Sequence, residues 1–131
     1  MDEYLHFMSG PHRMLMRVGA VCEVTPVEAG HTGGQHVLWR GNPLPVDTAR
    51  RLLDLDSGDE GILIVHGPNA APRGLLVDRV IGLCTIADRD FTPLSAKLPA
   101  PILQLFDCAC HETGGPYLLR CRDDWATVEK D

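Results

Sequence analysis

The chain of 131 residues is 44% hydrophobic and 23% charged, a length and composition that predict a single folded domain over residues 1–131. Its net charge of −6 would repel a phosphate backbone, so nucleic acid is not an expected partner. No apolar run reaches the ~18 residues of a membrane span, and Asp2 and Glu3 lie where a signal peptide needs positive charge, so we expect a cytoplasmic protein without membrane insertion.

The first half of the sequence predicts short β-strands separated by turns. Residues 4–8 and 13–18 flank the turn Ser9-Gly10-Pro11 and predict an opening hairpin, with alternating apolar residues in the second strand. Residues 28–36 contain three glycines and no apolar period, which indicates a loop. Strands are expected at 37–40 and 44–46, on either side of a turn that starts at Gly41.

A short helix is expected after these strands. Ala49, Leu52 and Leu53 lie at helical spacing, and Asp47 or Thr48 can serve as the N-cap. Next comes a buried strand at residues 62–66.

Residues 74–86 predict one long strand that is apolar on both faces. A strand of about a dozen residues is rare in a single flat sheet. Asp78 and Arg79 interrupt both faces, and Gly82 offers a place to bend. We therefore expect this strand to pass from one packed environment into another, as in two small barrels or sheets that share strands. A salt link between the two environments explains the charges at 78 and 79 better than a catalytic pair, because neighbours on a strand face opposite ways.

The last third predicts a proline-rich connector at 91–102, a strand at 102–110, a final strand at 117–121 and a short terminal helix from Asp123. No motif for catalysis accompanies these elements. The serines at 9, 57 and 95 lie outside any G-x-S-x-G elbow. The glycine-rich loop lacks the lysine and helix of a phosphate-binding loop. We therefore expect neither an enzyme nor a cofactor.

Five cysteines, an odd number among apolar neighbours, indicate reduced core thiols. The sequence contains weak candidate ligands for zinc, but it lacks the paired C-x₂-C spacing of common structural zinc sites. We expect no metal, while a small thiol or zinc protein stays open as a less favoured alternative. The weak candidate ligands are Cys108, Cys110, His111 and Cys121.

Three segments resemble patterns of one family, the CheW-like domains of bacterial chemotaxis signalling. The segment L-W-R-G-N-P-L-P-V-D-T-A-R is similar to the family pattern N-L-R-G-x-x-x-P-V-x-D-L-R. A G-L-x-V-D-x-V pattern and a V-x-E-V pattern are also matched. The matching residues are Arg40, Gly41, Pro45, Val46 and Arg50 in the first segment, Gly74, Leu75, Val77, Asp78 and Val80 in the second, and Val21, Glu23 and Val24 in the third.

This resemblance implies a mainly β fold of two small five-stranded β-barrels that share a hydrophobic core, with short helices. It also implies a non-enzymatic adaptor that couples a chemoreceptor to a CheA-type histidine kinase. Its partners would be the signalling tip of the receptor and the regulatory domain of the kinase. By position, Val21, Glu23 and Arg40 would contact the receptor, whereas the family likeness assigns no residue here to the kinase.

Two departures from the family pattern leave another interpretation open. Leu38 stands where the family has asparagine, and Thr48 stands where it has aspartate. Both changes favour a divergent module that docks on one kinase or scaffold outside motility. Arg40 could also hold the turn at Gly41 through an ion pair, and Glu23 could be a solvated strand charge.

Overall fold

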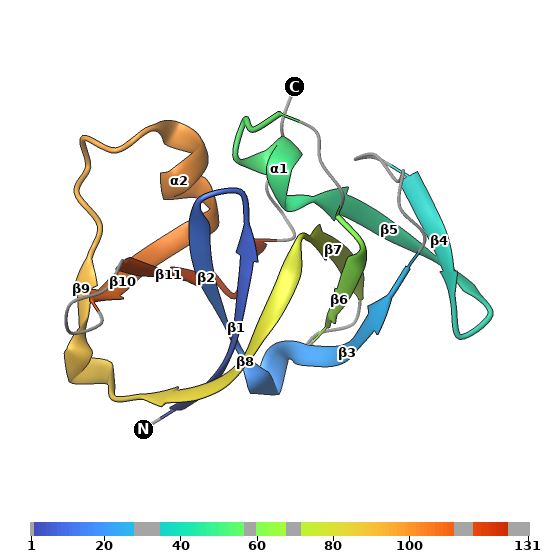
Figure 1. The fold of residues 1–131 in the computed structure, drawn as a ribbon, viewed down its shortest axis with the longest axis horizontal. Helices are drawn as coiled ribbons and strands as arrows, with labels where there is room; N and C mark the ends of the chain where they lie inside the picture. The colour runs from blue at the N-terminus through green and yellow to red at the C-terminus, as the bar shows by residue number, and fades with distance from the viewer. Residues whose placement is uncertain (1, 28–34, 57–59, 68–71, 112–116, 126–131) are drawn as a thin grey trace.

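The computed structural model describes residues 2–27, 35–56, 60–67, 72–111 and 117–125, and its strands form two sheets (Figure 1). The first sheet has five strands in the order β3-β6-β7-β5-β4. The second has six, in the order β8-β1-β2-β11-β10-β9. The expected mainly β fold of two sheets is confirmed, and the three-residue β9 gives the second sheet one strand more than the family pattern implies.

The strands of the first sheet are β3 (Val21–Pro26), β4 (Gln35–Trp39), β5 (Asn42–Thr48), β6 (Ile62–His66) and β7 (Arg73–Val77). Those of the second are β1 (Asp2–Ser9), β2 (His12–Arg17), β8 (Arg79–Ile86), β9 (Phe91–Pro93), β10 (Phe106–His111) and β11 (Tyr117–Cys121). The helical elements are η1 (Val18–Ala20), α1 (Ala49–Leu52), η2 (Asp88–Asp90) and α2 (Ala100–Leu105).

The hydrophobic core consists of three clusters, because several strands are buried on both faces. On β6, Ile64 belongs to a central cluster, whereas Leu63 and Val65 belong to a cluster inside the first sheet. On β2, Met14 joins the central cluster and Leu15 joins a third cluster inside the second sheet. The central cluster draws on both sheets, so the prediction of a shared core is confirmed.

The predicted long strand at 74–86 changes sheet at Asp78. Its first part is β7 of the first sheet, and its second part is β8 of the second. The register of β8 against β1 shifts beside Gly82, whose φ is +155°. The expected passage between two packed environments is confirmed. The apolar residues on both faces do not make β8 buried on both faces, since Ile81 and Leu83 are 44% and 63% exposed.

The predicted strand at 102–110 begins only at Phe106, because the residues before it form α2. Pro101 fits the first turn of a helix, where its missing N–H costs no hydrogen bond. Ile102 and Leu105 then pack on the central cluster at helical spacing. The prediction of a strand over 102–105 is therefore wrong, because the periodicity of so short an apolar run fits a helix as well as a strand.

The remaining elements follow the sequence closely. Thr48 caps α1 as predicted, its hydroxyl accepting the N–H of Arg51. The expected loop at 28–36 is corrected at its end, since β4 begins at Gln35, and residues 28–34 lie outside the described part. Residues 126–131 of the expected terminal helix also lie outside it. None of the helices in the described ranges has the length and apolar character needed to cross a membrane.

Candidate functional site

The turn between β4 and β5 holds Arg40 in an unusual backbone conformation. Trp39 pairs with Asn42, so Arg40 and Gly41 form a two-residue loop. Their φ angles are +51° and +80°, and a hairpin loop with positive φ at both positions is of type I′. Asparagine followed by glycine suits this turn best, whereas the left-handed region costs most other residues roughly 1–2 kcal/mol.

The side chain of Glu23 joins the two edge strands of the first sheet. Glu23 lies on β3 and accepts a hydrogen bond from Trp39 Nε1 on β4, at 3.2 Å from its Oε2. Its other oxygen lies 3.7 Å from Arg40 Nη2. The Arg40 guanidinium carbon lies 4.4 Å from the centre of the Trp39 ring, within range of a cation–π contact. The first sheet therefore curls until β3 and β4 meet through side chains.

Two exposed apolar residues are chain neighbours of this polar cluster and face the opposite sides of their strands. Leu38 on β4 is 81% exposed, and Val24 on β3 is also exposed. We call Glu23, Val24, Leu38 and Arg40 the β3–β4 surface. Of the three residues predicted to contact a receptor, Glu23 and Arg40 contact each other on this surface. Val21 begins β3 on the far side of a register shift and packs partly against the central cluster.

The motif residues Arg50 and Asp78 lie elsewhere, between the two sheets. Asp78 accepts hydrogen bonds from Arg50 Nε at 3.0 Å and Nη2 at 2.6 Å. It also accepts the N–H of Gly10, while its own N–H meets Met8 O and Ser9 Oγ. The hydrogen bond from Arg50, more than the opposing desolvation, lowers the pKa of Asp78. The expected salt link exists with Arg50, and Arg79 instead points its Nη2 at the sulfur of Met8.

The other motif residues serve packing. Val46 is buried inside the first sheet, and Val77 lies in the central cluster. Gly74 is tightly enclosed, since a Cβ there would lie 2.7 Å from Leu63 Cδ1 and 2.9 Å from Val46 Cγ2. Pro45 on β5 is half-buried, and Val80 on β8 is partly buried against the central cluster. Much of the family pattern is therefore explained by the interior.

The structure does not bring the weak zinc candidates together. Cys110 lies in the cluster of the second sheet and Cys121 in the central cluster. Cys108 is buried, and burial chiefly raises its pKa to about 12. His111 packs against Tyr117, with ring centres 4.7 Å apart and the ring planes tilted by 57°. Within the described ranges, no group of three or more His, Cys, Asp or Glu residues is placed to hold a metal.

Sequence reasoning missed the exposed face of β8. Ile81 and Leu83 read as core residues, because nothing in the sequence marks β8 as an edge strand. Exposed apolar residues on an edge strand favour association with another surface.

Comparison with known proteins identifies the family and the fold of this chain. A family model described as the CheW-like domain matches residues 3–106. The search of curated proteins finds no match. Among solved structures, the scaffolding protein TtCheW from Thermoanaerobacter tengcongensis is 14% identical and superposes with a TM-score of 0.72, over 92% of this chain and 88% of that chain. That likeness establishes the fold, and the family match, which spans most of the sequence, shows that the chain belongs to the CheW-like domain family.

Proposed function

We propose that this protein is a non-enzymatic adaptor that couples a chemoreceptor to the regulatory domain of a CheA-type histidine kinase. Membership of a family of scaffold domains supports an adaptor in general. The finer assignment of a receptor contact to Val21, Glu23 and Arg40 comes from the resemblance to the family, and the contact between Glu23 and Arg40 supports it for those two residues.

The observation that carries the proposal is the conformation of Arg40. An arginine at φ +51° is a poor choice for the fold, because asparagine fits the same turn with less strain. A residue kept in a costly conformation points to a role outside folding. The Arg40 side chain is 63% exposed, so its guanidinium remains accessible to a partner.

Two neighbours orient this guanidinium before any partner arrives. The Trp39 ring lies under it, and Glu23 lies at one end. An oriented side chain loses less conformational entropy on binding. A receptor tip that presents a carboxylate to Arg40 would complement the β3–β4 surface in charge, and Leu38 and Val24 offer apolar contacts on the exposed faces of the same strands.

Coupling also requires a second surface. Ile81 and Leu83 on β8 belong to the second sheet and are exposed. They offer an apolar contact that is separate from the ion pair of Glu23 and Arg40. A protein that holds its two partners on separate surfaces can transmit a change from one to the other.

Calorimetric titration against a receptor signalling tip, and separately against the kinase regulatory domain, tests this function. Arg40→Asn should keep the turn and weaken receptor binding about tenfold, the loss expected when an interface contact worth about 1.4 kcal/mol is removed. Kinase binding should stay unchanged. Arg89→Asn, at an exposed arginine of η2, is the matched control and should bind both partners normally. Leu83→Ser, titrated against each partner, determines which one uses β8.

One observation favours a second candidate, a divergent module that docks on a single kinase or scaffold. Leu38, which replaces the family's asparagine, is 81% exposed and makes the β3–β4 surface more apolar. Tight binding to the kinase domain, with no receptor binding and no effect of Arg40→Asn, would establish this candidate in place of the coupling adaptor.

A further inference from the structure

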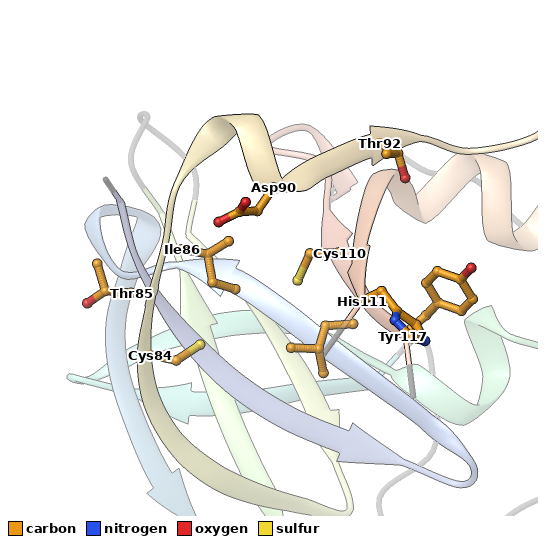
Figure 2. Close-up of a pocket in the computed structure, with 9 residues that line it drawn as sticks. Cys84, Thr85, Ile86, Asp90, Thr92, Cys110, His111 and Tyr117 are labelled. Carbon is orange, nitrogen blue, oxygen red and sulfur yellow. The ribbon is translucent and has the colours of Figure 1, made fainter. Parts of the chain in front are cut away.

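The second sheet contains a cavity of about 680 Å³, well away in sequence from Glu23 and Arg40. Figure 2 shows side chains from β8, η2, β9, β10 and β11 around it. The cavity is lined by Cys84, Thr85, Ile86, Asp90, Thr92, Cys110, His111, Tyr117 and Leu118.

The cavity lies where the two edges of the second sheet face each other. β8 and β9 are the first and last strands of that sheet, and both contribute lining residues. In the first sheet, Glu23 and Trp39 close the corresponding space between the edge strands. In the second sheet, the residues at this position are small or short, such as Thr85, Cys84 and Thr92, so an open space remains.

The inner wall of the cavity is apolar. Cys110 and Leu118 belong to the core cluster of the second sheet, and Cys84 and Ile86 pack against that cluster. In Figure 2, Ile86 and Cys110 approach the cavity from opposite strands. Such a wall favours a hydrocarbon or aromatic group, because burial of apolar surface provides the driving force.

The rim is polar and carries one acidic group. Thr85 and Thr92 bring hydroxyls, and the rings of His111 and Tyr117, which pack against each other, lie on the β10–β11 side. Asp90 at the end of η2 supplies a carboxylate, and among the lining residues that the structure describes it is the only one and there is no lysine or arginine. The charge of this rim therefore favours a cation, in agreement with the net charge of −6.

We propose that this cavity binds a small organic amine, whose apolar or aromatic body lies against Cys84, Ile86 and Leu118 and whose ammonium group meets the carboxylate of Asp90. The volume is within the range of about 300–1,000 Å³ typical of small-molecule sites. Ammonium beside carboxylate is a charge-assisted pair, and aromatic rings at the mouth attract cations as well. This site is independent of the proposed adaptor function.

Ligand-observed NMR with phenethylamine as the probe tests the site. Phenylacetate has a similar body and the opposite charge, so it should not bind. Asp90→Asn should weaken phenethylamine binding at least fivefold. Asp88→Asn removes an exposed carboxylate of the same turn that does not line the cavity, and it should leave binding unchanged. Thr85→Trp, at an exposed position of β8, should fill the cavity and abolish binding while the circular dichroism spectrum is retained.

A second measurement reports on the inner wall. Saturating phenethylamine should slow the alkylation of Cys84 by iodoacetamide in the wild type but not in Thr85→Trp. Absence of binding to the wild type, equal binding of phenylacetate, or equal losses in Asp90→Asn and Asp88→Asn would each overturn the proposal. None of these outcomes depends on whether a receptor or a kinase binds elsewhere.

Discussion

Arg50 donates two hydrogen bonds, of 3.0 and 2.6 Å, to the carboxylate of Asp78. Arg50 lies in α1, which follows β5 of the first sheet, and Asp78 lies at the junction of β7 with β8. Asp78 also accepts the N–H of Gly10 in the β1–β2 turn. One carboxylate therefore ties together elements of both sheets. The family pattern retains both residues at this junction, and the structure gives them a role in holding the two sheets together.

Asp78→Asn should destabilise the protein by about 2 kcal/mol, since hydrogen bonds to a charged group contribute roughly 1.5–3 kcal/mol. The pair is mostly buried, with side chains 21% and 23% exposed, so water screens it little. Urea denaturation followed by circular dichroism measures the change. Asp88→Asn, at an exposed carboxylate, is the control. A loss below about 0.5 kcal/mol, the range of ordinary surface substitutions, would contradict the assigned role.

The same carboxylate should contribute to acid sensitivity. Arg50 lowers the pKa of Asp78 in the folded protein, so folding favours the ionised form. The resulting stability is present above the unfolded pKa of about 3.9 and is lost as the pH falls through the lowered folded value. The stability difference between wild type and Asp78→Asn should be constant near neutral pH and shrink below about pH 4. A difference that persists unchanged at pH 2 would show that shape rather than charge matters at this position.

Glu60 should have the opposite pH dependence. It is 5% exposed, and desolvation, opposed by the N–H of Arg50, raises its pKa. The neutral form is favoured in the fold, so its contribution is full below the unfolded pKa and is lost as the pH rises through the raised folded value. Glu60→Gln keeps an oxygen to accept that N–H. As the pH rises from 4.5 to 8, the free energy of unfolding of Glu60→Gln should fall less than that of the wild type. Urea denaturation at each pH measures this difference.

The sequence predicted those features of the fold that local patterns determine. Alternating apolar residues located the opening hairpin, and Thr48 was among the expected caps for α1. The break at Asp78 was visible because charged residues interrupted both faces of an apolar run. The start of α2 was missed because a short apolar run near prolines fits helix and strand alike.

The candidate site depended on contacts that sequence cannot supply. Glu23 and Arg40 are 17 residues apart in the chain and meet only because the first sheet curls until its edges approach. The strain at Arg40 is equally hidden, since positive φ follows from the two-residue loop that strand register imposes. The cavity in the second sheet arises from the open edges of β8 and β9, which strand order alone reveals.

Thiol labelling should separate the cysteines by environment. Cys22 is exposed, whereas Cys108 and Cys121 are buried. Burial raises the pKa of Cys108 to about 12 and also raises that of Cys121, and only the thiolate reacts. Iodoacetamide at pH 8 should therefore modify Cys22 first and leave Cys108 and Cys121 intact, as read by peptide mass spectrometry. All three should react in guanidinium. Early modification of Cys121 in the native protein would contradict its place in the central cluster.

Gly74→Ala should destabilise the first sheet although alanine suits a strand better than glycine does. The added methyl group would lie 2.7 Å from Leu63 Cδ1, 2.9 Å from Val46 Cγ2 and 3.1 Å from Leu44 Cδ2, so three core side chains would have to move. Overpacking of this kind costs typically about 1–3 kcal/mol. Gly61→Ala is the matched control, because among the described residues a Cβ there meets only Val27 O, at an ordinary contact distance of 3.8 Å. Thermal denaturation should show a lower Tm for Gly74→Ala alone, and equal Tm values for the two variants would mean that the interior of the first sheet is loose enough to accommodate the methyl group.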